Sequence, residues 1–142
     1  MFNYQTATKK EISTLVDLNL ENLDTYDPRS KKQRDYLKKY LKETISEAIK
    51  NYQVIYLNQT KIGYYCIELG DEGYEFVDFY LLPDYRHQGY GKQILQEILP
   101  TYPNLYLYVF TRNQIAIKLY QQFGFEEVEK ISSSRIKMKK SA

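Results

Sequence analysis

Apolar residues recur along this chain with two periods, one typical of helices and one typical of strands. Helical spacing, with apolar residues three or four positions apart, marks 12–23, 37–49, 94–99 and 115–123. Runs rich in aromatic and β-branched residues mark strands at 2–6, 52–57, 61–69, 74–82, 105–110, 125–131 and 135–139. The resulting order, β-α-α-β-β-β-α-β-α-β-β, predicts an α/β (α+β) fold in which a mixed sheet is flanked by four helices.

The connections between segments predict how the central strands pair. Asn58-Gln59-Thr60 alone joins the second strand to the third, and Gly70-Asp71-Glu72-Gly73 joins the third to the fourth. Links this short are typical of hairpins, so these three strands should be antiparallel neighbours. No repeat or linker interrupts the pattern, and we expect one domain over residues 1–142.

Short motifs predict where helices begin and end. Thr8-Lys9-Lys10-Glu11 and Ser30-Lys31-Lys32-Gln33 fit the capping box, in which Ser or Thr is followed three residues later by Glu or Gln. They predict the starts of the first two helices. Gly124 follows the last helical segment directly and is placed to act as its C-terminal cap.

Composition narrows the class of protein. Twenty Lys and Arg against eighteen Asp and Glu leave a net charge of +2, too small to predict a nucleic-acid or membrane partner. No apolar run reaches the roughly 20 residues that span a bilayer. A single cysteine, Cys66, and no visible signal peptide favour a cytoplasmic protein without disulfides. One histidine and one cysteine exclude a Cys/His metal cluster, so we expect no metal, with only an all-carboxylate site left open.

Residues 81–92 form the first candidate for chemistry, a strand that leads through a glycine-bearing loop into a helix. Gly89 and Gly91 leave backbone N–H groups uncovered, and a helix N-terminus adds partial positive charge. This pattern predicts an anion cradle with Arg86 and Lys92 as nearby cations. On spacing alone an alternative stays open, a tight strand-to-helix turn that needs glycine for its dihedral angles.

The helix at 113–123 is the second candidate. Asn113, Ala116 and Tyr120 fall on one face of it, and the small alanine would let an extended ligand lie close. Asn113 and Tyr120 are then about 10 Å apart along the helix axis. The alternative for this segment alone is that Asn113 caps the helix and Tyr120 belongs to the core.

Together the two segments resemble the acetyl-coenzyme A (acetyl-CoA) motifs of the GNAT superfamily of N-acetyltransferases. The first is similar to Arg/Gln-x-x-Gly-x-Gly/Ala, at Arg86, Gly89 and Gly91. The second is similar to Asn-x-x-Ala-x-x-Leu-Tyr…Gly-Phe, at Asn113, Ala116, Leu119, Tyr120, Gly124 and Phe125. His87-Gln88 departs from the Gly-Lys of many members, which changes side chains but not the backbone cradle. The resemblance covers essentially the whole chain and implies a mostly antiparallel sheet, splayed between its fourth and fifth strands.

The resemblance also implies how acetyl-CoA would bind. The loop's backbone N–H groups should hold its pyrophosphate, from His87, Gln88, Gly89, Tyr90, Gly91 and Lys92. Pantetheine should enter the splay as a pseudo-strand and pair with the backbone of Phe79, Tyr80 and Leu81, beside a bulge expected near Tyr80-Leu81. An N–H near Leu81 would polarise the thioester carbonyl.

The family's helix residues take roles along the same path. Asn113 should hydrogen-bond the pantetheine arm, and Tyr120 should face the sulfur and protonate the departing thiolate. The general base is open between Glu75, where some family members carry a base, and Asp78, a charge among apolar neighbours that needs a partner or a task. Alternation along a strand points these two carboxylates to opposite faces unless a bulge intervenes. A water chain without a dedicated base is the remaining alternative.

We therefore expect an acetyl-CoA-dependent N-acetyltransferase that moves an acetyl group directly to an amine of a small molecule or peptide. The alternative from another class is a non-catalytic coenzyme A-binding regulator on the same fold. Several carboxylates favour a protonated amine if they converge, and are otherwise ordinary solvated groups: Glu21, Asp24, Asp27, Glu68, Asp71, Glu72, Glu75 and Asp78. The resemblance implies that the first two helices and their connection, 20–30, shape the substrate site, and homodimers are common in the family.

Overall fold

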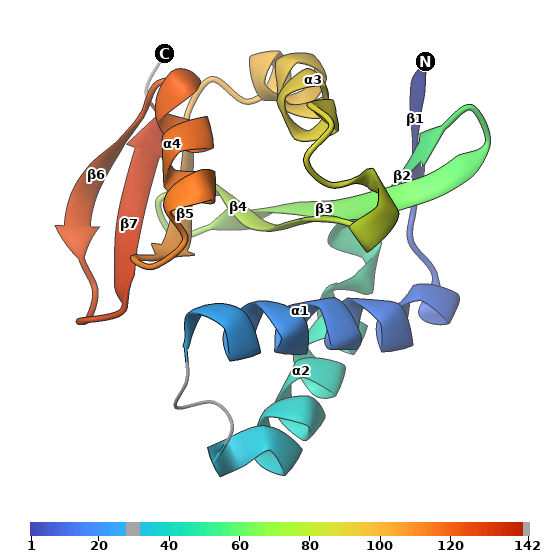
Figure 1. Ribbon diagram of the computed structural model, residues 1–142, viewed down its shortest axis with the longest axis horizontal. Coiled ribbons are helices and arrows are strands. Elements are labelled where there is room, and N and C mark those ends of the chain that lie inside the picture. Colours follow the sequence, from blue (N-terminus) through green and yellow to red (C-terminus); the bar gives the residue numbers. More distant parts are fainter. Residues whose placement is uncertain (28–31, 141–142) are drawn as a thin grey trace.

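The computed structural model describes residues 1–27 and 32–140, which form one sheet between two layers of helices (Figure 1). The main elements are β1 (Phe2–Thr6), α1 (Ile12–Tyr26), α2 (Arg34–Ala48), β2 (Tyr52–Leu57), β3 (Thr60–Gly70), β4 (Gly73–Leu81), α3 (Tyr90–Ile98), β5 (Leu105–Phe110), α4 (Gln114–Gln122), β6 (Phe125–Lys130) and β7 (Arg135–Lys140). Short 3₁₀ turns flank several of them. The predicted order of helices and strands is confirmed.

The seven strands lie in the order β1-β2-β3-β4-β5-β7-β6. Every neighbouring pair is antiparallel except β4 and β5, which are parallel. The two hairpins predicted from short connections, β2–β3 and β3–β4, are therefore confirmed. The fold is the mixed, mostly antiparallel sheet that the sequence predicts.

Strands β4 and β5 separate soon after they meet. They pair only at Tyr74 with Leu105 and at Glu75 with Tyr106, where β4 begins. From Phe76 to Leu81, β4 is paired with β3 on one side and has no strand partner among the described residues on the other. The predicted splay between the fourth and fifth strands is confirmed, and it leaves a gap in the middle of the sheet.

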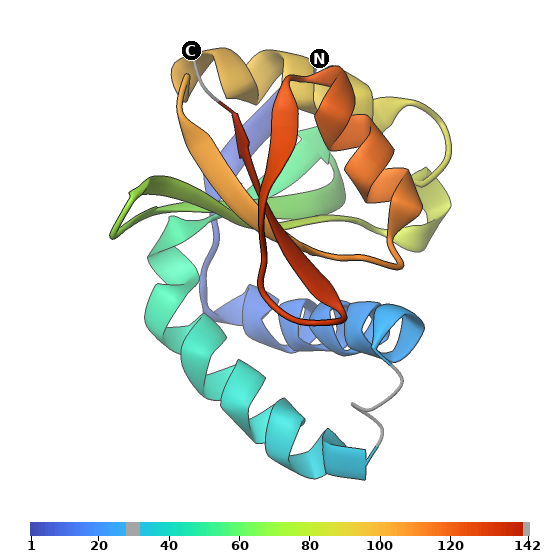
Figure 2. The ribbon, with the colours of Figure 1, turned by 90° about the vertical axis from the view of Figure 1, so that its left-hand side faces the viewer.

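Helices cover the two faces of the sheet unequally. Helices α3 and α4 lie over one face, and α1 and α2 lie over the other, beneath the N-terminal strands (Figures 1 and 2). The α3–α4 side buries a core that includes Ile62, Ile94, Leu95, Leu105 and Phe125. The α1–α2 side buries a second core that includes Leu15, Leu20, Ile45, Tyr64 and Cys66. The first core contains residues from both sides of the gap, such as Ile62 of β3 and Leu105 of β5, so it holds the two parts of the sheet together where the strands diverge.

The capping box predicted at Thr8–Glu11 is wrong. Thr8 makes no side-chain cap, and Glu11 is buried, accepting hydrogen bonds from Lys61 Nζ at 2.7 Å and Tyr64 OH at 2.5 Å. These two donors outweigh the desolvation of the carboxylate and lower the pKa of Glu11. Glu11 thus ties the start of α1 to β3 instead of capping a helix. The second predicted box, 30–33, begins outside the described residues.

The β-bulge lies at Val77, three to four residues earlier than expected. Cys66 of β3 is opposite Asp78, but the next residue, Ile67, is opposite Phe76, so Val77 is the extra residue in β4. The expectation of a bulge near Tyr80-Leu81 is wrong, because those residues continue a regular ladder with β3.

The displaced bulge changes which carboxylates share a face. Glu75 pairs with Glu68, and Asp78 pairs with Cys66, two residues away on β3. Since residues two apart on a strand point to the same face, Glu75 and Asp78 lie on one face of the sheet, the α1–α2 side. Simple alternation would have separated them.

Among the described residues, no helix is both long and apolar enough to cross a membrane.

Candidate active site

The loop between β4 and α3 has the backbone of an anion cradle. Its residues His87 and Gly89 take left-handed dihedral angles, φ +61° and +83°, and Gly89 is the N-cap of α3. The side chain of Gln88 donates to Asp84 O at 2.7 Å, which closes the loop on itself. No side-chain cap covers the first N–H groups of α3, and Lys92 is exposed in its first turn. An anion at this helix end would meet free donors and a positive dipole.

The two glycines of the motif have different structural reasons. At Gly89 the positive φ disfavours any residue with a Cβ, and nothing lies within 4 Å of where that Cβ would be. At Gly91 the backbone is helical, and an added Cβ would make ordinary 3.8 Å contacts with Leu119 and Phe79. The geometry therefore requires glycine at the first position and tolerates alanine at the second.

The end of β4 offers backbone groups to the gap. Leu82 N donates to Ile62 O at 2.8 Å, which fixes the phase of the β3–β4 ladder. Because hydrogen-bonded pairs alternate in an antiparallel ladder, Tyr80 directs its backbone groups toward β3, whereas Phe79 and Leu81 direct theirs into the gap. The register thus offers the backbone of Phe79 and the N–H of Leu81 to a partner between the strands, and excludes Tyr80.

The Arg86 side chain lies away from the open space of the cradle. Its Nε donates to Leu81 O at 2.8 Å, and its terminal nitrogen makes a 2.7 Å ion pair with Glu21 Oε1 on α1. The loop after β4 is thereby joined both to the strand that precedes it and to the helix on the opposite face.

Asn113 and Tyr120 are seven residues apart, which places them on one face of α4. Asn113 is the N-cap, and its Oδ1 accepts from Ala116 N at 3.2 Å, as the capping alternative expects. The Asn113 amide nitrogen is not used by this cap. Ala116 and Tyr120 are partly buried against the α3–α4 core.

Tyr120 combines an apolar ring environment with a nearby negative charge. The ring contacts Phe76 and Phe125 edge-on, with centroids 6.2 and 5.6 Å away. Among the described residues its hydroxyl has no hydrogen-bond partner. Burial, and then the charge of Asp78, raise the pKa of Tyr120 well above its ordinary value. The phenol is therefore protonated at neutral pH, as a proton donor must be.

Asp78 is held in a network of hydroxyl and amide donors. Tyr52 OH donates to its Oδ2, Asn19 Nδ2 lies 3.5 Å from the same oxygen, and Tyr80 OH lies 3.3 Å from Oδ1. Tyr80 OH also reaches Asn19 Oδ1 at 3.0 Å, so its single proton has two acceptors. Burial raises the pKa of Asp78 to about 6, although these donors act in the opposite direction.

Glu75 stands where β4 and β5 separate, and it is more open than Asp78. No hydrogen bond or ion pair joins its carboxylate to any described residue. Burial, followed by the charges of Glu68 and Asp78, raises the pKa of Glu75. Glu68 lies directly opposite and accepts from Asn51 Nδ2 at 3.0 Å. A carboxylate with free lone pairs beside two like charges is suited to take up a proton.

Most of the other carboxylates named in the sequence analysis are paired elsewhere. Glu21 pairs with Arg86, Asp24 with Arg34, and Glu72 with Lys137. Lys137 also lies 4.8 Å from the centroid of the Tyr106 ring. The acidic groups that affect one another's pKa beside the gap are thus Glu68, Glu75 and Asp78. They are not close enough together to hold a metal ion, and no group of three or more His, Cys, Asp or Glu side chains that could do so occurs among residues 1–27 and 32–140.

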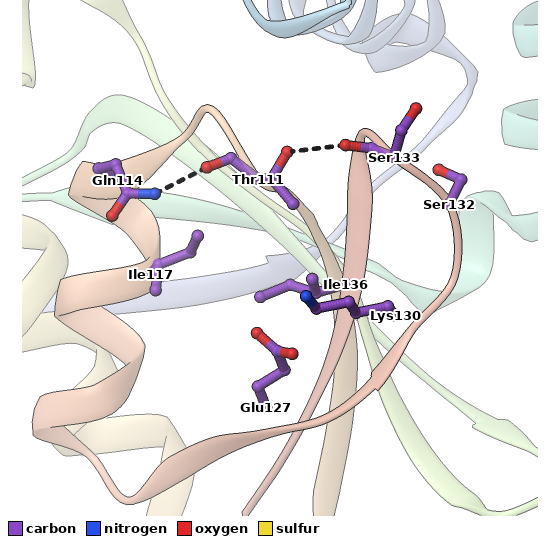
Figure 3. A pocket seen from close by; sticks show the side chains of 8 residues that line it. All are labelled: Thr111, Gln114, Ile117, Glu127, Lys130, Ser132, Ser133 and Ile136. Carbon is purple, nitrogen blue, oxygen red and sulfur yellow. Dashed lines mark hydrogen bonds between the residues drawn. The ribbon is translucent and has the colours of Figure 1, made fainter.

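A cavity of about 420 Å³ lies apart from these residues, on the neighbouring face of α4 (Figure 3). It is lined mainly by Gln114 and Ile117 of α4, Glu127 and Lys130 of β6, and Ser132 and Ser133 of the β6–β7 turn. Gln114 Nε2 donates to Thr111 O at 2.8 Å at its rim. None of the predicted site residues lines this hollow.

Sequence reasoning missed the residues that hold Asp78. Tyr52 and Asn19 come from β2 and α1, far from Asp78 in the chain. The signal available was the charge itself, since an aspartate among apolar strand residues must find donors. With sixteen tyrosines in the chain, the sequence offers no way to single out Tyr52.

This chain is similar to known acetyltransferases in its sequence. The sequence model described as "Acetyltransferase (GNAT) family" matches residues 16–125. The uncharacterised N-acetyltransferase YycN of Bacillus subtilis is 39% identical over 64 residues, 42% of this chain and 41% of the relative. N-alpha-acetyltransferase 50 of Danio rerio is 32% identical over 88 residues, 54% of this chain and 52% of the relative. These matches span about half the length of each relative or less.

A solved structure shows the same fold over its whole length. The PaiA N-acetyltransferase of Thermoplasma acidophilum, in complex with coenzyme A, superposes with a TM-score of 0.76 at 18% identity. The match covers 100% of this chain and 99% of the other. At this identity the likeness concerns the fold alone.

Proposed function

This chain belongs to the acetyltransferase (GNAT) family, and we propose that it transfers an acetyl group from acetyl-CoA directly to an amine of a small molecule or peptide. The observation that carries the proposal is the gap between β4 and β5. Its edge offers the backbone of Phe79 and the N–H of Leu81, and the uncapped N-terminus of α3 lies at the end of the adjoining loop. An extended acyl carrier with an anionic end fits that combination of groups.

In this proposal the loop from His87 to Lys92 binds the donor's pyrophosphate through backbone N–H groups. The backbone of Phe79 pairs with the pantetheine arm, and the free amide nitrogen of Asn113 hydrogen-bonds it from α4. The Leu81 N–H then donates to the thioester carbonyl, where negative charge develops when the amine attacks. Ala116 leaves room for the arm along α4.

Tyr120 is the proposed general acid. Attack of the amine breaks the C–S bond, and the hydroxyl proton of Tyr120 passes to the departing thiolate. The free hydroxyl of Tyr120 supports this role, because the phenol is protonated at neutral pH and its proton is not committed to another acceptor among the described residues.

Glu75 is the proposed general base, ahead of Asp78. An ammonium group with an ordinary pKa near 10 must lose a proton before it attacks. The oxygens of Asp78 already accept from several donors, whereas the carboxylate of Glu75 accepts from no described residue. Glu75 can therefore receive the amine's proton directly or through one water, and its raised pKa makes it a better base than an ordinary glutamate.

The pH profile separates the two carboxylates. A base must be ionised to act, so kcat/KM should fall as the pH drops below its pKa, which for Glu75 lies above the ordinary glutamate value. Glu75→Gln should lower kcat/KM by roughly 10²-fold and remove this acidic limb. Asp78→Asn should leave the limb in place. A limb near pH 6 that survives in Glu75→Gln and disappears in Asp78→Asn would instead identify Asp78, whose pKa is raised to about 6.

The acidic surroundings favour a protonated amine as the acceptor. Glu68, Glu75 and Asp78 gather beside the proposed reaction centre and would attract a cation. The names of both relatives, N-acetyltransferase and N-alpha-acetyltransferase, support an amine nitrogen as the acceptor.

An acetylation screen tests the proposal. Polyamines, aminoglycosides, amino acids and peptides with free N-termini are incubated with acetyl-CoA, and thiol release is followed. We expect turnover with cationic amines, and rates at low substrate concentration that fall as salt is added, because salt screens the attraction. If no class of acceptor supports thiol release, the proposed transfer is contradicted. A clear preference for acidic acceptors, with rates that rise with salt, would contradict the proposed acceptor.

A further inference from the structure

The unpaired end of β4 is held by one side chain. Without a neighbouring strand, the Leu81 carbonyl in the gap has no backbone donor, and Arg86 Nε supplies one at 2.8 Å. The other half of the same peptide unit, Leu82 N, donates to Ile62 O at 2.8 Å. Because a peptide unit is planar, these two bonds fix its orientation from both sides of the strand.

The same guanidinium joins β4 to α1. The terminal nitrogen of Arg86 contacts Glu21 Oε1 at 2.7 Å, and two residues earlier on α1 the Asn19 side chain meets Tyr80 OH at 3.0 Å. Helix α1 is therefore attached to the end of β4 at two successive levels. One of them includes Asp78, through Asn19 Nδ2.

The Leu81 N–H belongs to the preceding peptide unit, which shares the Leu81 Cα with the unit that these bonds fix. We propose that Arg86 and Glu21 form a clamp that holds Leu81 at this Cα and so positions its N–H for catalysis. This inference rests on the proposed function, in which that N–H donates to the thioester carbonyl. Arg86 suits the task because its planar fork presents several donors at fixed angles, so it bonds a backbone carbonyl and a carboxylate together. Arg86 is thus a positioning residue that acts through the backbone, and its charge is neutralised by Glu21 rather than directed at the donor's pyrophosphate.

Loss of the clamp should change the position of the backbone donor and not the stability of the fold. The two side chains are 32% and 51% exposed, and pairs this open contribute little to folding stability. Loss of the pair should therefore leave the protein folded but let the last peptide units of β4 rotate. Misplacement of a donor by a fraction of an ångström is enough to lower a rate.

Two conservative variants test the clamp. Arg86→Lys keeps the positive charge but not the fork, and Glu21→Gln removes the charge of the partner. In the free protein, we expect the Leu82 amide to exchange with deuterium roughly tenfold faster in both variants, as local opening becomes easier. This measurement needs no donor, so it tests the clamp even if the wild-type protein binds no acetyl-CoA, which would refute the proposed function by itself.

The catalytic part of the inference is read from the thioester. With ¹³C-labelled acetyl-CoA bound, the carbonyl stretching frequency should shift in both variants toward that of the free thioester, since the Leu81 N–H polarises it less. We expect kcat to fall roughly tenfold while the dissociation constant of the donor hardly changes. The double variant should be no slower than either single one, because both remove the same contact.

A matched control is available on the same helix. Asp24→Asn removes another Arg–carboxylate pair of α1, with Arg34 of α2, and it should leave the Leu82 exchange rate and the carbonyl frequency unchanged. The clamp is refuted if Leu82 exchange in Arg86→Lys equals that of the wild type. It is also refuted if Glu21→Gln tightens donor binding at an unchanged carbonyl frequency, which would make Arg86 a cation for the pyrophosphate.

Discussion

Tyr120→Phe is expected to lower the maximal rate of acetyl transfer by roughly 10²–10⁴, the usual contribution of a positioned proton donor. The substitution removes one hydroxyl and keeps the ring, which packs against Phe76 and Phe125 at 6.2 and 5.6 Å. Packing and donor affinity should therefore change little. Because no described residue bonds the hydroxyl, its loss leaves no partner unsatisfied, and the melting temperature should hold or rise.

The measurement is turnover at saturating acetyl-CoA, with a melting curve and donor binding as controls. Tyr102→Phe provides the matched variant, since Tyr102 packs against the same core and lies outside the proposed site; its turnover should equal that of the wild type. A Tyr120→Phe protein that is folded, binds donor and turns over at the wild-type rate would remove the general-acid assignment. It would also remove the main argument for catalysis over mere coenzyme A binding.

The sequence predicts the strands well because their signals are local. Runs rich in aromatic and aliphatic residues place β5 at 105–110 and β2 at 52–57, with the bounds that the structure shows. The hairpins follow from connections too short to allow any other geometry. Gly124, predicted as the cap of α4, follows that helix with φ +91°. Each of these features is decided within a few residues of chain.

The sequence does not predict features that depend on register between strands. The bulge at Val77 arises from the pairing of β3 with β4, and Val77 itself is an ordinary strand residue that carries no sequence signal for a bulge. One inserted residue turns every later side chain to the other face, so it decides that Glu75 and Asp78 act on the same side. Alternation alone would place Glu75 and Asp78 on opposite faces. A bulge between them reverses this, but only the strand register shows where the bulge lies.

Side-chain partners across the fold are equally hidden from the sequence. Glu11 fits a capping box by spacing. In the structure its carboxylate instead accepts hydrogen bonds from Lys61 and Tyr64 of β3. Arg86 fits the cradle motif, yet its guanidinium bonds Leu81 and Glu21. In both cases a local motif correctly marks the backbone, while tertiary contacts decide what the charged side chain does.

Gly89→Val is expected to abolish the stabilisation of the folded protein by acetyl-CoA. A ligand bound only by the folded state at 100 times its dissociation constant adds about 2.7 kcal/mol, enough to raise the melting temperature by several degrees. Gly89 is the N-cap of α3, and nothing lies within 4 Å of an added Cβ, so a valine side chain would extend into the space beside this helix end and obstruct an anion there. It would also oppose the left-handed φ of +83°, at a cost of about 1–3 kcal/mol.

Strain and obstruction must be separated, and the chain offers a matched glycine for this. Gly73 begins β4 with φ +108° and likewise has nothing within 4 Å of its missing Cβ, but it lies in the β3–β4 turn, away from the loop before α3. Gly73→Val should lower the melting temperature to a similar extent and keep the full shift with acetyl-CoA. Gly91→Ala should also keep it, since its Cβ meets only ordinary 3.8 Å contacts. If Gly89→Val is folded and still gains the wild-type shift, the backbone amides before α3 do not hold the pyrophosphate, and the cradle must be sought elsewhere.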